Sequence, residues 1–385
     1  MTPYRGPLAG LGLLAESAAR PGVAYDLVEG DTGVKFGLFV PQGWRMDLVG
    51  IEPEMHWGVM AGLARRVDAN EDWTSIWVYD HFHTVPVPSE DATHEAWTLM
   101  AALAAVTGRV RLGQMCSCMS YRNPALLAKV AATVDVISEG RVEMGIGAGW
   151  YEHEWRAYGY GFPSAGERLA RLREGVEIFR QMWTTGEATY AGEHYKVDGA
   201  RCWPRPLQGT SYPGSRANGI PMWIAGGGER KTLRIAAEYA DYTNFDGTPE
   251  VFAAKSAILR RHCDDIGRDV SQIVRTADYN VFVGSTERGV EERIGQLADR
   301  LHGAGVPEKV VDRQVAEARR GPLVGTPEMI VEKLRELEKL GMTYAICYFP
   351  EAAYDTTGIA LFEREVIPEL VDRREHGHLW HLGRR

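Results

Sequence analysis

The sequence predicts an α/β protein whose fold is a (β/α)8 TIM barrel. Short, almost continuously apolar stretches alternate with stretches of helical length, which is typical of a parallel sheet covered by helices. Eight apolar stretches of this kind follow one another, and eight parallel strands close into a barrel. An open doubly wound sheet is the alternative fold; it is disfavoured because no GxGxxG motif follows the first predicted strand.

The chain is interpreted as one domain with additions, since single barrels can exceed roughly 250 residues. Residues 1–33 show no sustained periodicity and are predicted to be an N-terminal extension, whereas residues 34–385 form the barrel domain. Gly, Pro and aromatic residues at about 186–219 interrupt the alternation. They predict an inserted loop or hairpin over one end of the barrel, and a lid is one role for it.

The first half of the predicted barrel holds four strands and four helices, recognised by apolar runs and by helical periodicity. The strands are KFGLFV (35–40), SIWVYD (75–80), VRLGQMCSC (110–118) and RVEMGIG (141–147). The helices are expected at about 54–71, 94–107, 124–138 and 166–183.

The second half continues the alternation less evenly. Its strands are PMWIA (221–225), DYTNF (241–245), TADYNVFVG (276–284) and TYAICYF (343–349). Its helices are expected from Glu229 and at about 249–266, 287–302, 327–340 and 359–371, with a charged helix at 308–320. Thr326 and Pro327 predict a clean helix start, with Thr326 as the N-cap and Pro327 in the first position.

The composition indicates a cytoplasmic globular enzyme. Of the 385 residues, 45% are hydrophobic and 25% are charged, and the formal net charge is -9. That charge disfavours nucleic acid as a partner, because neutralising phosphates requires clustered Lys and Arg. No apolar run reaches the roughly 18 residues that span a bilayer, so no membrane partner is expected. The five cysteines are scattered and predict neither a disulfide framework nor a metal site.

Candidate catalytic residues follow the second predicted strand. Barrel active sites are built at the C-terminal ends of strands, and His81 lies there with a proton that is tunable near neutral pH. His81 is therefore the candidate general acid or base, and Asp80 either accepts from a buried donor or orients His81. The pattern His81-Phe82-His83 also resembles the metal-binding pairs of barrel hydrolases, but later strands end in Gly147, Ala225 and Phe349, which offer no metal ligands.

Two glycine-rich stretches are candidate ligand-binding loops. Gly147-Ala148-Gly149 would let the backbone approach a ligand closely, and Trp150 would supply a flat apolar wall. Gly226-Gly227-Gly228 precedes a predicted helix, whose free N-terminal amides favour phosphate. A simple tight turn is the alternative interpretation of the second stretch.

Three segments resemble the luciferase-like monooxygenase superfamily: SIWVYDHF, the block from Arg111 to Trp155, and PMWIAGGGERKTLRIAAEYAD. The resemblance covers about 34–241 well and the remainder loosely. Within the superfamily, GAGWYEHEWRAYGYGFPS and LRIAAEYAD are most similar to the branch that uses the deazaflavin coenzyme F420.

The resemblance implies a luciferase-like barrel that holds the cofactor ring at its C-terminal mouth and the cofactor phosphate near the three glycines. It also implies a non-prolyl cis peptide between Met115 and Cys116, behind the ring, and an acid/base role for His81. The cofactor-binding residues expected in this way are Asp80, Met115, Cys116, Gly147, Ala148, Gly149, His153, Ala225, Gly226, Gly227 and Gly228. The expected substrate-binding residues are Trp44, Phe82, Trp150 and Tyr151.

One departure concerns the substrate. Sugar-phosphate dehydrogenases of this branch carry a catalytic Glu where this chain has Trp150, and a Trp where it has Val85. Glucose 6-phosphate is therefore disfavoured as a substrate.

The sequence as a whole predicts an F420-dependent oxidoreductase that transfers a hydride to or from a small, partly hydrophobic organic molecule. The alternative is a monooxygenase that uses reduced FMN. A barrel that binds the cofactor without turnover, as a carrier or sensor, is a third interpretation, which His81 disfavours. Relatives are often dimers, so a homodimer is expected.

Overall fold

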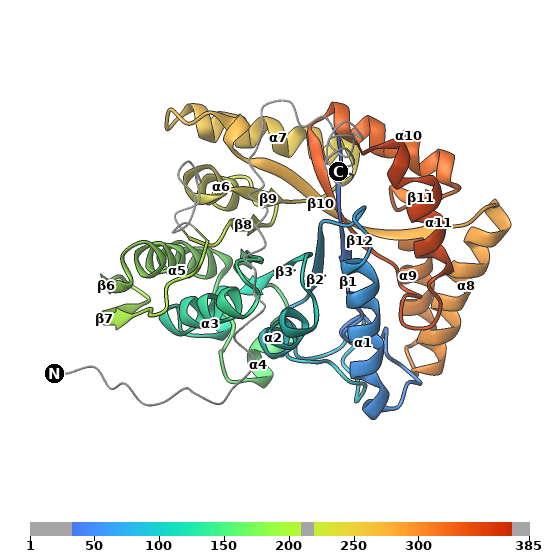
Figure 1. The fold of residues 1–385 in the computed structure, drawn as a ribbon, viewed down its shortest axis with the longest axis horizontal. Helices are drawn as coiled ribbons and strands as arrows, with labels where there is room; N and C mark the ends of the chain where they lie inside the picture. Colours follow the sequence, from blue (N-terminus) through green and yellow to red (C-terminus); the bar gives the residue numbers. More distant parts are fainter. Residues whose placement is uncertain (1–32, 209–218, 372–385) are drawn as a thin grey trace, which may run out of the picture.

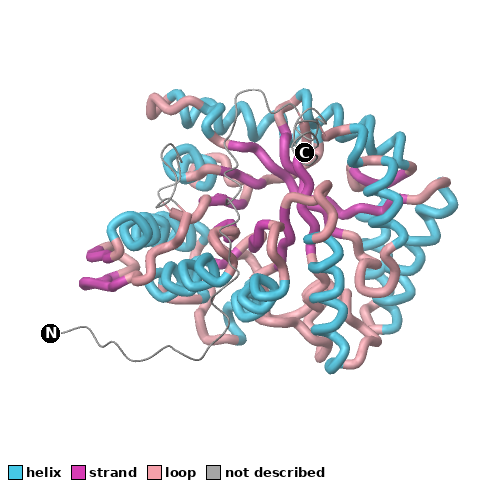
Figure 2. The backbone as a smooth tube through the Cα atoms, viewed as in Figure 1, coloured by secondary structure: helices cyan, strands magenta, loops and turns pink. Residues whose placement is uncertain are grey.

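The computed structural model describes residues 33–208 and 219–371, and its core is a closed parallel barrel of eight strand positions surrounded by helices (Figures 1 and 2). The predicted fold class is therefore confirmed. Residues 1–32 of the predicted extension, residues 209–218 of the predicted insertion and residues 372–385 lie outside the described ranges.

The barrel strands follow one another in sequence order, and each of the eight predicted strands occupies one position. In order they are β1 (Lys35–Phe39), β2 (Ser75–Val78), β3 (Arg111–Gln114) with β4 (Ser117–Cys118), β5 (Val142–Gly147), β8 (Met222–Ala225), β9 (Tyr242–Asn244), β10 (Val274–Val283) and β12 (Met342–Tyr348). The last strand pairs with the first in parallel, with Leu38 opposite Cys347, which closes the barrel. The short strand β11 (Leu323–Gly325) extends the sheet beside β10 and was not predicted.

Helices pack around the outside of the barrel (Figure 1). They are α1 (Pro53–Asp68), α2 (Ala96–Val106), α3 (Pro124–Ile137), α4 (Glu152–Ala157), α5 (Ala165–Thr185), α6 (Thr232–Tyr239), α7 (Pro249–Asp264), α8 (Glu287–Gly303), α9 (Glu308–Arg319), α10 (Pro327–Lys339) and α11 (Thr357–Glu365). Helix α10 has Thr326 at its N-cap and Pro327 in its first turn, as predicted. Helix α4 was not predicted, and α6 begins three residues later than expected.

Two apolar cores follow from the alternation of side chains along each strand. Phe36 and Leu38 face outward and join the core between the sheet and the helices. Phe39 faces inward, where its ring stacks on Tyr79 at 4.2 Å between centroids. The interior is thus packed with aromatic rings, as expected for a barrel whose centre is a core and not a pore.

The third strand is the main local difference from the prediction. A cis peptide joins Met115 to Cys116, as the resemblance implied, and it divides the predicted strand into β3 and β4. The partner strand β5 has a glycine opposite this bulge: a Cβ on Gly145 would lie 1.8 Å from the carbonyl oxygen of Gln114. An uninterrupted apolar run does not reveal such a bulge, because the residues on both sides of it are buried.

The predicted insertion contains an antiparallel hairpin, β6 (Glu187–Ala191) with β7 (Lys196–Arg201), which lies outside α5 (Figure 1). Beyond β7 the chain runs along α3, where Lys129 Nζ donates to the carbonyl of Trp203 at 3.2 Å. Gln208 Nε2 then donates to the carbonyl of Val142, the first residue of β5, at 2.7 Å. The described part of the insertion therefore reaches the N-terminal end of the barrel, away from the mouth.

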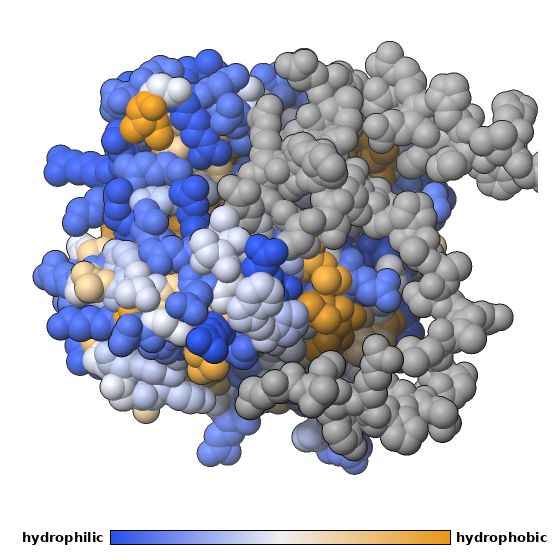
Figure 3. Space-filling view, turned by 60° about the vertical axis from the view of Figure 1, so that its left-hand side comes forward, coloured by the Kyte–Doolittle hydropathy of each residue, from blue (hydrophilic) through white to orange (hydrophobic). Residues whose placement is uncertain are grey.

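Hydrophilic side chains cover most of the described surface in the view of Figure 3, and hydrophobic ones gather there in small separate patches. None of the described helices is long and apolar enough to cross a membrane.

Candidate active site

The C-terminal ends of β1, β2 and β5 bring together His81 and three of the predicted substrate-binding residues. The imidazole of His81 stacks on Trp44, with ring centroids 4.1 Å apart and planes within 3°. Trp150 and Tyr151 approach the same imidazole edge-on, at 5.7 and 6.0 Å between centroids. Trp150 is 61% exposed, so His81 lies in an aromatic recess whose outer wall faces solvent.

Glu154, which the sequence analysis missed, is the partner that orients His81. Its Oε2 lies 2.9 Å from His81 Nδ1, and its Oε1 accepts from the backbone amides of Phe82 and His83 at 2.8 and 2.9 Å. The short helix α4 carries Glu154 beside the fully buried Trp155, which fixes the helix against the barrel. The signal in the sequence was a Glu next to an apolar anchor just after a strand end.

The electrostatics of Glu154 favour the ionised carboxylate. Burial by itself raises the pKa of Glu154, but the hydrogen bond and charge interaction with His81 and the two backbone amides outweigh it, so the pKa is lowered. Tyr121 adds a hydrogen bond from its hydroxyl to Oε2 at 2.9 Å. Because an ionised carboxylate only accepts, Nδ1 of His81 must carry the hydrogen, and Nε2 is left to exchange a proton at the mouth.

Asp80 accepts from buried donors and does not orient His81. Arg122 binds both of its oxygens, at 2.8 and 2.9 Å, and the amide of Cys118 donates to Oδ2 at 3.0 Å. Asp80 thus ties the end of β2 to β4, directly beyond the cis peptide. Asp80 therefore supports the bulge, and through the bulge the wall that was predicted to contact the cofactor.

The bulge presents Met115 and Cys116 to the barrel interior. Both belong to the inner aromatic cluster, as does Ala225 at the end of β8. Cys116 and Ala225 are half-buried, so this wall is open to a ligand in the mouth. Burial raises the pKa of the Cys116 thiol to about 12, which keeps it neutral at physiological pH.

The glycines after β5 are explained by packing against the bulge. A Cβ on Gly147 would lie 2.7 Å from Cys116 Sγ, and a Cβ on Gly149 would lie 2.5 Å from Cys118 Sγ. Gly149 also has φ +80°, a conformation that favours glycine. Ala148 between them is half-buried. These residues therefore have a structural role, whatever they contribute to ligand binding.

The glycines after β8 have more space around them. Gly226 has φ +114°, and a Cβ there would meet only Thr232 at 3.4 Å. Gly227 is similarly open, whereas a Cβ on Gly228 would lie 2.6 Å from Thr232 Oγ1. Since α6 begins at Thr232, the three glycines form a loop that leads into a helix N-terminus, where amides can bind an anion.

Two predicted site residues lie apart from the recess. Phe82 packs against Tyr121 and Tyr158, at 4.7 and 4.4 Å between ring centroids. His153 is exposed at the rim, where its Nδ1 lies 2.9 Å from Nδ1 of His83. The structure therefore places Phe82 behind the recess and His153 beside it.

The recess and its surroundings fit a planar cofactor with polar edges. The indole Nε1 of Trp44 is buried beside His81 with no hydrogen-bond partner among the described residues, so it can donate to a ligand carbonyl. The half-buried wall of Cys116 and Ala225 offers a flat apolar support, and the open Gly226 loop offers backbone amides to a phosphate. Among the described residues no group of three or more His, Cys, Asp or Glu could hold a metal.

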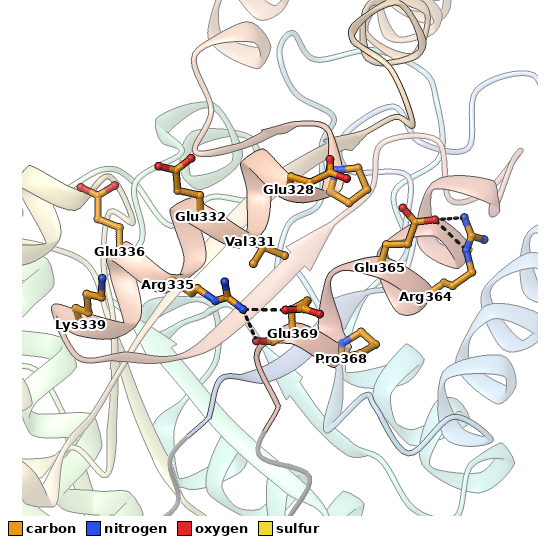
Figure 4. Close-up of a pocket in the computed structure, with 11 residues that line it drawn as sticks. Glu328, Val331, Glu332, Arg335, Glu336, Lys339, Arg364, Glu365, Pro368 and Glu369 are labelled. Atoms are coloured by element: carbon orange, nitrogen blue, oxygen red, sulfur yellow. Dashed lines mark hydrogen bonds and ion pairs between the residues drawn. The ribbon is translucent and has the colours of Figure 1, made fainter.

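A second hollow lies on the outside of the barrel, between α10 and the end of α11 with the residues that follow it (Figure 4). Charged side chains line it and pair with one another, as Arg335 does with Glu369 at 2.8 Å and Arg364 with Glu365 at 2.6 Å. Among the described residues, its lining contains no aromatic, His or Cys side chain. The barrel mouth is therefore the candidate active site.

The barrel defines the fold class of the protein, a (β/α)8 barrel. Residues 34–344 match the sequence profile of the family described as luciferase-like monooxygenase, so the chain belongs to this family and is a (β/α)8-barrel oxidoreductase.

Known proteins similar to this chain include both F420-dependent enzymes and monooxygenases. An F420-dependent glucose-6-phosphate dehydrogenase of Amycolatopsis mediterranei is 35% identical over 43% of this chain, but the match spans only 45% of that relative. The pyrimidine monooxygenase RutA of Stutzerimonas stutzeri is 27% identical over 73% of this chain and 79% of its own length. An F420-dependent secondary alcohol dehydrogenase, solved with an F420-acetone adduct, has a similar fold, with a TM-score of 0.71 at 19% identity over 88% of this chain and 100% of its own.

Proposed function

We propose that this protein transfers a hydride between coenzyme F420 and a small, partly hydrophobic organic substrate, with His81 exchanging a proton with the substrate. The observation that carries the proposal is the buried His81–Glu154 pair, enclosed by Trp44 and Trp150 at the barrel mouth. A proton-transfer group held by a carboxylate in a largely apolar recess suits reversible oxidation of an alcohol or reduction of a carbonyl.

The chain's residues have distinct roles in this proposal. Met115 and Cys116 would stand behind the cofactor ring, and the loop from Gly226 to Gly228 would bind its phosphate. When bound, the deazaflavin supplies or accepts the hydride. His81 would hold or release the substrate proton through Nε2, while Glu154 keeps the hydrogen on Nδ1. The aromatic walls would exclude water from the reacting groups.

Two lines of support favour F420 over FMN. The segments after the fourth and fifth barrel strands resemble the F420 branch, and the relative from Amycolatopsis mediterranei uses F420. That relative's substrate is disfavoured, because Trp150 replaces the catalytic Glu of sugar-phosphate dehydrogenases. The exposed indole of Trp150 favours a partly hydrophobic molecule.

Monooxygenation with reduced FMN is the second candidate. The alignment with RutA favours it, because it extends over 73% of this chain. In that case Trp44 and Trp150 would shield the oxygen chemistry from water, and the same recess would hold the substrate.

Cofactor binding separates the two candidates. The purified protein is mixed with F420 or FMN, and binding is followed by fluorescence anisotropy. We expect a micromolar or tighter complex with F420 and none with FMN at the same concentrations. Tight FMN binding accompanied by oxygen consumption would overturn the proposal in favour of monooxygenation. F420 binding with no turnover across a panel of alcohols and carbonyl compounds would favour a carrier or sensor. A homodimer and a cytoplasmic location stay predictions.

A further inference from the structure

Arg45, in the loop after β1, is a cation held in place at the mouth by neutral groups. Its guanidinium lies over the ring of Tyr348, 4.2 Å from the centroid, and Nη1 donates to Asn280 Oδ1 at 2.7 Å. The hydroxyl of Tyr79 lies 3.5 Å from the same nitrogen. Contacts with β10, with β12 and with the residue that follows β2 thus fix the position of this charge.

Within the described residues the guanidinium is only partly satisfied. Nε and Nη2 donate no hydrogen bond to a described residue, although Arg carries five N–H donors. No described carboxylate forms an ion pair with it; Asp278, two residues before Asn280 on the inward face of β10, interacts with it only at longer range. Burial alone would lower the pKa of Arg45, but Tyr79 and Tyr348 outweigh it and raise the pKa, so the charge is permanent.

A cavity of about 80 Å³ adjoins this cation. Its polar lining consists of Arg45, Asn280 and Gln314, together with the carboxylate of Glu317, which accepts from Gln314 Nε2 at 2.9 Å. Val85, Pro86 and Phe282 form an apolar wall. The volume exceeds the roughly 30 Å³ that one water molecule occupies in the liquid, so a group of a few non-hydrogen atoms can enter. A half-buried arginine with free donors beside such a space is suited to a carboxylate, which it can bind through two parallel hydrogen bonds.

The cavity is lined in part from the loops after β1 and β2, the same loops that carry Trp44 and His81. The indole of Trp44 lies 4.1 Å from the His81 ring and 6.0 Å from the Arg45 guanidinium, so both side chains border the same aromatic ring. The loop of Gly226 follows β8, which lies four strand positions from β1, directly across the barrel. A cofactor phosphate at that loop would leave Arg45 free for the substrate.

We propose that Arg45 binds a carboxylate of the substrate, and that the enzyme therefore acts on a carboxylic acid whose alcohol or carbonyl carbon lies at His81. This substrate class rests on the proposed hydride transfer. Asn280 is a positioning residue in this scheme, because its Oδ1 accepts from Nη1 and so orients the guanidinium.

The test compares two probes of similar size, 4-fluorobenzoate and 4-fluorobenzyl alcohol, by ¹⁹F NMR titration of the full-length protein. We expect the acid to bind roughly 10- to 100-fold more tightly than the alcohol, the preference expected of a charge-assisted hydrogen bond. Arg45→Gln should abolish this preference. The control Arg288→Gln, which removes an exposed arginine of α8, should leave it unchanged. An equal preference in Arg45→Gln and in the unmodified protein, or no preference in either, would overturn the proposal.

A second variant covers a folding defect in Arg45→Gln. Asn280→Leu keeps the charge but removes its tether, and we expect it to weaken acid binding several-fold while the alcohol binds as before. Unchanged acid binding in a folded Asn280→Leu protein would contradict the positioning role.

The carboxylates of F420 itself are another possible source of the anion. If Arg45 binds substrate, saturating F420 leaves 4-fluorobenzoate bound, and Arg45→Gln binds F420 with the affinity of the unmodified protein. Displacement of the probe by F420, with weaker F420 binding in Arg45→Gln, would overturn the proposal. The probe titration needs no cofactor, so a protein that binds the acid through Arg45 but not F420 would refute the proposed function and keep the acid site.

Discussion

At the scale of single residues, the candidate functional unit is the pair of His81 and Glu154, of which the sequence predicted only His81. His81 could be nominated because a titratable side chain at a strand end is a local pattern. Glu154 could not be paired with it, because 73 positions separate the two residues and only the closed barrel brings α4 beside the end of β2. The nearby acidic residue Glu152, exposed on the same helix, could not be told apart from it by composition.

Replacing Glu154 tests whether the pair acts as a unit. Glu154→Gln can still accept hydrogen bonds, but it no longer supplies the negative charge that favours a protonated imidazole. We expect kcat to fall by roughly 10- to 100-fold, as part of the usual contribution of acid–base catalysis. We also expect the ¹⁵N NMR shifts of the His81 ring nitrogens to change, because a carboxylate no longer holds the hydrogen on Nδ1.

The matched control is Glu152→Gln, whose side chain is exposed and pairs only with Arg156 in the same helix. It should leave kcat and the His81 ring shifts unchanged. The ¹⁵N NMR shifts of the His81 ring nitrogens give a readout independent of turnover. A lower kcat in Glu154→Gln with unchanged ring shifts would indicate a merely structural role.

At the scale of elements, the strands were predictable and the break in one of them was not. Apolar runs bounded by turns located all eight barrel strands, because strands covered on both sides are apolar along their whole length. The bulge at Met115 is buried on both sides, so hydrophobicity alone does not mark it. The glycines at 145, 147 and 149 did mark this region in the sequence. Their spacing is required at least as much by close packing against β3 and β4 as by the approach of a ligand.

A pair of glycine substitutions separates backbone conformation from packing. Gly149 and Gly159 have nearly equal angles, φ +80° and φ +77°, but a Cβ on Gly159 would meet nothing within 4 Å. Each Gly→Ala change should cost about 1 to 2 kcal/mol for the left-handed backbone. Gly149→Ala should cost about 1 to 3 kcal/mol more, because its methyl group overlaps Cys118 and Trp155.

Urea unfolding followed by circular dichroism measures both free energies. Equal losses in the two variants would show that α4 and β4 relax freely around residue 149. In that case the packing explanation of the glycines after β5 would be wrong.

At the scale of the whole molecule, stability and chemistry occupy opposite ends of the barrel. Near the N-terminal ends of the strands, the buried carboxylate of Glu143 on β5 pairs with Arg111 on β3 and accepts from Trp223 Nε1 on β8 at 2.6 Å. These contacts join three strands far below His81. Residues at this end of a barrel are expected to serve stability, whereas those at the mouth serve function.

Substitutions at the N-terminal end should therefore change stability and leave ligand binding unchanged, whereas substitutions at the mouth should do the reverse. Glu143→Leu leaves Arg111 buried without its charge partner, and we expect unfolding free energy to fall by about 3 to 5 kcal/mol while the folded protein keeps its cofactor affinity. Adding Arg111→Leu should recover much of the loss, since an apolar pair often replaces a buried ion pair at little cost.

Trp150→Ala, at an exposed position of the mouth, should change unfolding free energy by less than about 0.5 kcal/mol but raise the substrate KM. Urea unfolding and cofactor titration on the same preparations check all three variants. Loss of cofactor binding in folded Glu143→Leu would mean that contacts at the N-terminal end also shape the mouth, and that stability and chemistry are not separated along the barrel.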